Sequence, residues 1–420
     1  MSPEKHVPDE HDVVIVGGGP AGMMAGLLFA RAGVEVVVLE KHGDFLRDFR
    51  GDTVHPSTME ILDQLGMLER FLQRPHNAFS QARLTIAGHT VTIGDLRFLK
   101  TPAPFVAVMP QWEFLDFLKV EAAAFPAFRL EMVSEAKRMI ERDGRIAGVE
   151  LAGGRRITAR KLVIAADGRS SIVRRSRLLP LTELGSPIDV FWFAVPKSDD
   201  GGDVLRGLAQ PGSMMALIDR GDNWQCAYIV PKGTAERLQA QGIAAMRARI
   251  EHVAPVLGPL DSVLTSFDQL HLLTVKLDRL SRWHRPGLLA IGDAAHAMSP
   301  MGGIGINLAI QDAVAAANAL AAPLRAGRAV DGLLERVERR RRLPTRLVQA
   351  AQQAAQDRVI MGVFKPGAAF DRPPWQLRLL DRFPLLRRIP GRMIGLGVRR
   401  ERVQSPLAVP IAPSDRPPAP

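Results

Sequence analysis

The fold of this chain is decided by the stretch Val13-Val14-Ile15-Val16-Gly17-Gly18-Gly19-Pro20-Ala21-Gly22. Its apolar, β-branched start is typical of a buried strand, and a helix of small residues over 21–31 is predicted after the glycines. Gly17 allows a tight turn out of the strand, Gly19 lets the backbone approach a pyrophosphate, and Gly22 lets the helix lie close to the sheet. The helix start also presents free N–H groups and the positive end of its dipole to phosphates.

The second strand of this unit supports the same interpretation. It is predicted over 35–39 and is followed by Glu40 and Lys41. A carboxylate about twenty residues beyond the glycines can accept hydrogen bonds from an adenosine ribose. A glycine-rich turn without a ligand is the alternative, but strand, helix, second strand and acid all occur at the required spacing. The unit therefore predicts dinucleotide binding.

Two further strand-to-glycine turns lie far downstream. One contains Asp167 and Gly168, and the other contains Gly292 and Asp293. Ligands of open α/β sheets bind at the carboxyl ends of the strands, so Asp293 is placed to hold a ribityl hydroxyl. A helix cap is the alternative role for an aspartate at this position.

The segment after Pro300 is rich in glycine. Gly302, Gly303 and Gly305 free a stretch of backbone that a flat ring can approach closely. The alanine-rich helix predicted over 307–321 directs its N-terminus at that ring, where it stabilises negative charge. A flexible loop before a helix is the alternative. In their order and separation, the three glycine segments indicate an FAD-dependent oxidoreductase that uses oxygen.

Together these segments resemble the group A (single-component) flavoprotein aromatic hydroxylases, the para-hydroxybenzoate hydroxylase type, across residues 1–345. The resemblance implies FAD contacts from Gly17, Gly19, Pro20, Ala21, Gly22, Glu40, Lys41, Arg50, Gln111, Asp167, Gly168, Arg174, Gly292, Asp293, Gly305, Ile306 and Asn307. Among these, Arg50, Gln111 and Asn307 depend on the resemblance alone. It also implies that the segment around Asp167 takes part in NAD(P)H binding, and that the oxygen-reacting face is formed by Pro300, Gly302 and Gly303. No acid–base residue is assigned.

The predicted fold class is α/β, with a Rossmann-like FAD-binding lobe interleaved with a mixed-sheet substrate lobe and followed by a helical C-terminal segment. The predicted FAD-binding domain is discontinuous and comprises 1–78, 104–184 and 273–345; the substrate domain comprises 79–103 and 185–272; the helical segment spans 346–404 and a disordered tail spans 405–420. The tail is assigned from its proline content.

The predicted substrate lobe carries aromatic residues on two neighbouring strands. Strand alternation places Trp224 and Tyr228 on one face of one strand, and Trp192 lies on the other strand. If the pocket faces these side chains, it is apolar with few polar groups and fits an aromatic or polyketide-like substrate. The alternative is that they form the sheet core against a helix.

The amino-acid composition indicates which partners and which cellular compartment to expect. The net charge is +11, yet the chain has one tyrosine and lacks the aromatic interleaving that stacks bases, so nucleic acid is not an expected partner. One cysteine and a polar N-terminus without the apolar core of a secretion signal predict a cytoplasmic protein. No metal-spaced cluster is visible, and His296 is expected to have a structural or cofactor-contact role.

The basic, leucine-containing segment 375–398 leaves two hypotheses open. It is suited to lie on a membrane surface, as a peripheral contact. The alternative is a helix pair that packs on the flavin lobe or on the partner of a homodimer.

The predicted function follows from the resemblance. NADPH or NADH reduces FAD, and oxygen is used to hydroxylate an aromatic or polyketide-like small molecule through a flavin hydroperoxide. The alternatives are an FAD-dependent dehydrogenase or reductase, or a quinone-pathway hydroxylase acting on an apolar isoprenoid. A halogenase is disfavoured because its Trp-x-Trp-x-Ile-Pro signature is not present. A flavin-binding module without turnover is the remaining class.

Overall fold

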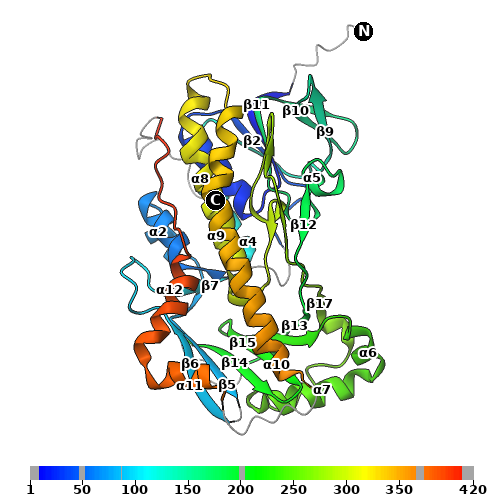
Figure 1. Cartoon of the computed structure of the whole chain (residues 1–420). Coiled ribbons are helices and arrows are strands. Elements are labelled where there is room, and N and C mark those ends of the chain that lie inside the picture. The colour runs from blue at the N-terminus through cyan, green and yellow to red at the C-terminus, as the bar shows by residue number, and fades with distance from the viewer. Residues whose placement is uncertain (1–8, 47–52, 87, 198–203, 366–372, 409–420) are drawn as a thin grey trace.

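A computed structural model describes residues 9–46, 53–86, 88–197, 204–365 and 373–408. Figure 1 shows an upper lobe built on one sheet, a lower lobe built on another, and a long helix, α9 (Leu334–Ala355), running between them. The predicted α/β class with two interleaved sheet lobes is confirmed. The predicted domain boundaries remain predictions, and α9 runs without interruption through 345–346, where one of them falls.

The upper sheet has β1 (Glu10–Val16) at its centre, between two parallel neighbours. The strand order is β19-β20-β11-β1-β2-β8, with β10 and β9 added as antiparallel strands beside β11. The other strands are β2 (Val36–Leu39), β8 (Phe128–Glu131), β9 (Ala136–Arg142), β10 (Arg145–Leu151), β11 (Arg156–Ala165), β19 (His284–Arg285) and β20 (Leu288–Ala290). Parallel neighbours bring the carboxyl ends of β1, β11 and β20 to the same edge, so the three glycine turns meet there.

Both faces of the upper sheet are buried, which explains its continuous apolar strands. Val13 and Ile15 face a core shared with the helices, whereas Val14 and Val16 face the opposite core with Trp283. The first core contains α1 (Pro20–Arg31), α2 (Pro56–Gln64), α3 (Leu68–Leu72), α4 (Gln111–Ala123) and α8 (Gly305–Arg325). By length and composition alone, Met301–Arg325 could cross a membrane, but most of it is buried, so its apolarity is explained by its core position.

The lower sheet has seven strands in the order β17-β13-β16-β15-β14-β5-β6. Its strands are β5 (Gln81–Ile86), β6 (His89–Asp95), β13 (Ile188–Pro196), β14 (Val204–Gln210), β15 (Ser213–Asp219), β16 (Asn223–Pro231) and β17 (His271–Leu273). One face packs against α6 (Ala235–Ala240) and α7 (Gly242–Val253). The two helices are divided at Gly242, which has a positive φ.

Two small sheets connect the lobes. One contains β3 (Thr53–Val54), β4 (Asn77–Phe79) and β7 (Val106–Val108), and the other contains β12 (Leu181–Glu183), β18 (Asp278–Leu280) and β21 (His296–Ala297). The short helices α5 (Ile172–Arg175) and α10 (Met361–Val363) follow the middle glycine turn and the end of α9.

The C-terminal part wraps around both lobes. Helices α11 (Trp375–Arg382) and α12 (Arg388–Leu396) lie beside β6, and the chain then returns along the upper lobe (Figure 1). There the Arg31 guanidinium donates to the carbonyls of Ser405 and Pro406, and the Ala408 N–H donates to the carbonyl of Arg31. Backbone and guanidinium hydrogen bonds therefore fasten residues 405–408 to α1; the rest of the predicted disordered tail, 409–420, lies outside the described part.

Candidate flavin site

The first glycine turn has the geometry that a bound phosphate requires. Gly17 adopts a φ of +105°, and a Cβ atom there would overlap the carbonyl of Ala166. A Cβ atom on Gly22 would overlap the carbonyl oxygen of Gly17, whereas one on Gly19 would meet nothing within 4 Å. Gly17 and Gly22 are therefore needed for packing, and Gly19 borders open space. Helix α1 begins here without a side-chain cap, which leaves its first N–H groups to a ligand.

Glu40 lies directly beside this turn at the end of β2. Its Oε2 accepts a hydrogen bond from the Gly18 N–H at 2.9 Å, and its Oε1 accepts one from the His42 N–H at 3.1 Å. The carboxylate is thus held next to the glycines, at the position expected for a ribose contact. Gly18 was not singled out in the sequence, yet it both donates to Glu40 and packs on it. Lys41 is exposed.

The middle turn follows β11, whose register with β1 pairs Ala165 with Val16. Asp167 Oδ2 accepts a hydrogen bond from the Ile172 N–H at 2.7 Å. Its other oxygen, Oδ1, is buried without a hydrogen-bond partner among the described residues. Burial raises the pKa of Asp167, although hydrogen bonds from Ser171 and Ile172 oppose the shift. A buried acceptor without a partner at the edge of the glycine turns is what a missing cofactor hydroxyl or bound water would satisfy.

The third turn brings α1 and α8 together at Gly292. A Cβ atom on Gly292 would lie 3.0 Å from the Cβ of Ala21 and 3.2 Å from that of Ala309, closer than ordinary contacts. Asp293 follows as a half-exposed residue, and its Oδ2 accepts from Nε of Arg169 at 3.2 Å. Gly305, at the start of α8, lies next to the same carboxylate. The arrangement leaves Asp293 accessible to a ligand hydroxyl while a guanidinium balances its charge.

The loop after Pro300 is held against β3. Gly302 and Gly303 have φ values of +79° and +61°, and a Cβ atom on Gly303 would overlap the Thr53 side chain. The Asn307 side chain fastens this loop: Oδ1 accepts from the His55 N–H and the Thr58 hydroxyl, and Nδ2 donates to the carbonyls of Thr53 and Gly303. All of its donors and lone pairs are used in this way. The Asn307 side chain therefore shapes the loop, and the predicted flavin contacts of Gly305, Ile306 and Asn307 stay predictions.

Three other predicted cofactor contacts are Arg174, Gln111 and Arg50. Arg174 is buried, with its Nε donating to the Ala294 carbonyl at 2.8 Å and a terminal nitrogen donating to Asp278 Oδ1 at 2.7 Å. Its side chain therefore braces the third turn, while its second terminal nitrogen, Nη2, has no hydrogen-bond partner among the described residues; cofactor contact by Arg174 stays a prediction. Gln111 is half-buried at the start of α4 and makes no side-chain hydrogen bond with the described residues. Arg50 lies outside the described residues.

The predicted substrate residues separate onto two faces of the lower sheet. Trp224 and Tyr228 are 1% and 2% exposed, and they pack in the core against α7. These two predictions are corrected: alternation was right that they share a face, but α6 and α7 cover that face. Trp192 points to the opposite face, where it packs near Met301 of the loop after Pro300 and Phe364 beyond α10.

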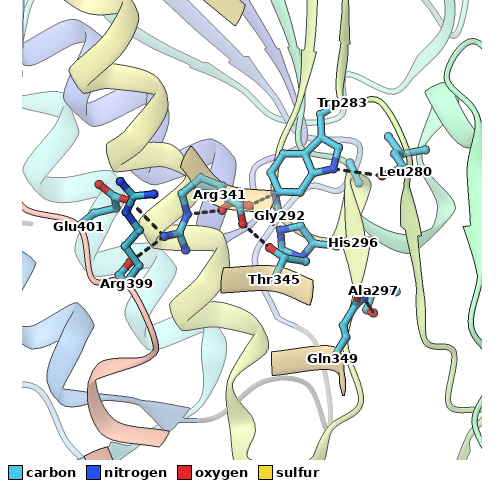
Figure 2. Close-up of polar contacts among 12 residues, drawn as sticks. Leu280, Trp283, Gly292, His296, Ala297, Arg341, Thr345, Gln349, Arg399 and Glu401 are labelled. Atoms are coloured by element: carbon cyan, nitrogen blue, oxygen red, sulfur yellow. Dashed lines mark hydrogen bonds and ion pairs between the residues drawn. The ribbon is translucent and has the colours of Figure 1, made fainter. Parts of the chain in front are cut away.

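A buried network of charged side chains supports the third glycine turn (Figure 2). The sequence prediction missed this network. Asp312 Oδ2 lies 2.6 Å from Nε2 of His296 and accepts from the Gly292 N–H at 3.0 Å. Its Oδ1 accepts from Nε of Arg341 at 2.9 Å, and Arg341 also contacts Glu401 at 3.2 Å. Burial disfavours the carboxylate, but His296 and Arg341 outweigh it and hold the pKa of Asp312 below its usual value. The sequence signal that could have revealed this network is the single aspartate inside an alanine-rich, buried helix.

Together these features define a class of protein: a two-lobe oxidoreductase with a flavin nucleotide site at three glycine turns. An FAD binding domain family model matches residues 10–351. A 6-methylpretetramide 4-monooxygenase from Streptomyces rimosus is 33% identical over 402 residues, covering 94% of each chain. A rifampicin monooxygenase from Streptomyces venezuelae is 29% identical, and the match covers 77% of this chain and 66% of that longer protein.

Solved structures agree on the fold. PqsL from P. aeruginosa, in complex with 2-aminobenzoylacetate, matches with a TM-score of 0.72 at 21% identity and covers 85% of this chain and 97% of its own. OxyS anhydrotetracycline hydroxylase from Streptomyces rimosus matches with a TM-score of 0.68 at 22% identity, covering 92% and 76%. The chain belongs to the FAD-binding-domain family of flavin-dependent monooxygenases. The resemblance to aromatic hydroxylases and the predicted class of FAD-dependent monooxygenase acting on aromatic or polyketide-like compounds are confirmed, whereas NADPH or NADH as the reductant stays a prediction.

Proposed function

We propose that this monooxygenase hydroxylates a flat, polycyclic aromatic substrate of the polyketide type, with NADPH or NADH as the reductant. The observation that carries the proposal is the apolar sheet face around Trp192, which lies opposite the loop after Pro300. The similarity to a 6-methylpretetramide 4-monooxygenase over 94% of both chains supports this substrate class.

The protein's own groups have separable tasks in this reaction. Bound FAD supplies hydride acceptance and oxygen activation. The start of α1, Glu40 and Asp293 bind and orient the nucleotide, and Gly302 and Gly303 keep side chains away from the ring face. The N-terminus of α8 favours the negative charge that develops on reduction. The partly exposed Arg169 adds positive charge beside Asp293, which supports capture of an anionic nicotinamide nucleotide.

The test measures reduction and oxygen transfer separately. Anaerobic reduction of the FAD-loaded enzyme by NADPH and by NADH is followed with and without hydroxylated tetracyclic and anthraquinone compounds. Faster reduction with such a compound, followed by incorporation of one ¹⁸O atom from ¹⁸O₂ into it, is the expected result. Turnover in air that yields a product without new oxygen would refute the proposal in favour of a dehydrogenase.

We also propose a cytoplasmic enzyme that touches anionic membrane surfaces through α11 and α12. Large apolar side chains are exposed along this segment, with Leu385 at 68% and Ile389 at 67%. Exposed arginines accompany them at Arg378, Arg382, Arg388 and Arg392. Apolar side chains between cations are suited to an interface of acidic headgroups.

Vesicle co-sedimentation tests this contact. Binding to vesicles containing phosphatidylglycerol, but not to pure phosphatidylcholine, should weaken at high salt and in the double variant Leu385→Ser/Ile389→Ser. Absence of vesicle binding together with a dimeric mass in light scattering that the same variant converts to a monomer would assign this surface to a homodimer.

A further inference from the structure

The indole N–H of Trp192 is a buried donor that the protein itself leaves without an acceptor. Among the described residues, Nε1 of Trp192 makes no hydrogen bond. By contrast, Nε1 of Trp283 donates to the Leu280 carbonyl at 3.2 Å. Buried donors in folded proteins are almost always paired, so a lone one near an active site indicates a group that arrives with a ligand or with water.

The strand register places small side chains directly beside this donor. Trp192 on β13 pairs with Ala227 on β16, which pairs with Ala216 on β15. Residues in register on one face point the same way, so the row runs from His271 on β17 through Trp192, Ala227 and Ala216 to Gly207 on β14, and the large indole stands beside two methyl groups. The next row along the strands is Val190, Ile229 and Met214, which are larger. The part of this row formed by Ala227, Ala216 and Gly207 is therefore a low, flat and apolar shelf, and the Trp192 indole stands beside it.

The cluster around the shelf contains one residue of the flavin loop and three residues from the end of α9 onward, Ile360, Met361 and Phe364. Met301, which directly follows Pro300, packs against the same cluster as Trp192, Ala216 and Ala227. Most of these facing side chains are only partly buried, although they lie between the two lobes. A flat ring system lying on the two alanines would present one edge toward Gly302 and Gly303 and another edge to the indole.

We propose that Nε1 of Trp192 donates a hydrogen bond to a carbonyl or hydroxyl oxygen of a planar polycyclic substrate that lies over Ala216 and Ala227. This contact fixes which ring edge meets the flavin loop, so Trp192 is a specificity-determining residue that sets the position of hydroxylation. The inference rests on the proposed function, because it names the anchor of that substrate. A site built to donate to a substrate oxygen discriminates strongly against an analogue that lacks it.

The primary test observes the donor in the FAD-loaded wild-type protein. The probe is 1,8-dihydroxyanthraquinone, and anthracene is the matched probe without oxygen. The chain has 5 tryptophans, so the Trp192 indole resonance in a ¹⁵N-labelled sample is assigned by its loss in Trp192→Phe. A downfield shift of this resonance with the quinone but not with anthracene is expected. Failure of the quinone to bind, or binding that leaves the resonance unmoved, would overturn the proposal.

Binding constants of variants give the second readout. Trp192→Phe should raise the Kd of the quinone about tenfold and leave that of anthracene unchanged, since it removes the N–H and keeps an aromatic ring. Ala227→Leu should weaken both probes because it fills the shelf. Trp224→Phe, on the α7-covered face of the neighbouring strand, is the control and should change neither. Equal losses for both probes in Trp192→Phe would show a packing role only.

The outcomes for the proposed function and for this inference are distinguishable. An indole shift and a quinone-selective loss of binding, without ¹⁸O incorporation into any compound, would refute hydroxylation and retain the anchor. Hydroxylation at the same ring position in Trp192→Phe as in the wild type would refute the anchor and retain the monooxygenase.

Discussion

Replacing Asp312 by asparagine should destabilise the protein more than any exposed charge substitution. Asp312 accepts from the Gly292 N–H, from Arg341 and from His296. The amide side chain of the Asp312→Asn variant would have one acceptor oxygen and would turn an NH₂ group toward one of these donors. The guanidinium of Arg341, itself fully buried, would lose half of its charge balance and keep only Glu401. Removing one partner of a buried ion pair typically costs about 3–5 kcal/mol.

The assay is urea unfolding of the FAD-saturated protein at pH 7, followed by circular dichroism. The free energy of unfolding of Asp312→Asn should be about 3–5 kcal/mol lower than that of the wild type. The matched control is Glu335→Gln, which breaks the exposed ion pair with Arg339 and should cost less than about 0.5 kcal/mol. A loss below about 1 kcal/mol in Asp312→Asn, with FAD fully retained, would refute the claim that this network supports the third glycine turn.

The first glycine turn allows a paired test: Gly22→Ala introduces an overlap with the Gly17 carbonyl and should yield protein without FAD, whereas Gly19→Ala should fold normally and bind FAD more weakly. The 450 nm absorbance per chain reports both results, and full FAD content in Gly22→Ala would contradict this packing. Burial raises the pKa of Cys226, so its thiol should not react with a disulfide reagent at pH 8 until urea unfolds the chain; a fast native reaction would contradict its place in the core. Burial lowers the pKa of His55 to about 4, although its hydrogen bond to the Ile394 carbonyl opposes the shift. Between pH 6.5 and 4 the unfolded state therefore binds more protons at His55, and stability falls as the pH falls. Acidification from pH 7 to 5 should cost the wild type about 2 kcal/mol more than His55→Leu, and parallel pH dependences in urea unfolding would contradict the assignment.

Much of the nucleotide site could be predicted because glycine requirements are local. A strand, a turn with positive φ at Gly17 and a close helix–strand approach at Gly22 leave a pattern in neighbouring positions. The same is true of Gly302 and Gly303. The positive φ values act through backbone geometry within a few residues, so they are visible without knowing which elements pack together, whereas the close approaches of Gly17 to Ala166 and of Gly303 to Thr53 join distant segments. The two-lobe fold and the flavin monooxygenase class followed from three such local patterns in the correct order.

Hydrogen-bond partners and covered faces were decided only by tertiary structure. Trp192 and Trp224 both occur in alternating strands, but α7 covers the face with Trp224, whereas Met301 of the flavin loop and residues 360–364 pack on the face with Trp192. The sequence also predicted Asn307 and Arg174 at the cofactor; only the tertiary structure shows that the Asn307 side chain is fully used by protein partners, whereas Arg174 bonds Ala294 and Asp278 and keeps one terminal nitrogen without a partner among the described residues. The link from Asp312 through Arg341 to Glu401 joins three segments that are far apart in the chain. The amino-acid sequence therefore determined where the backbone can turn, whereas packing determined which polar and aromatic side chains remain for ligands, because burial and pairing depend on distant segments.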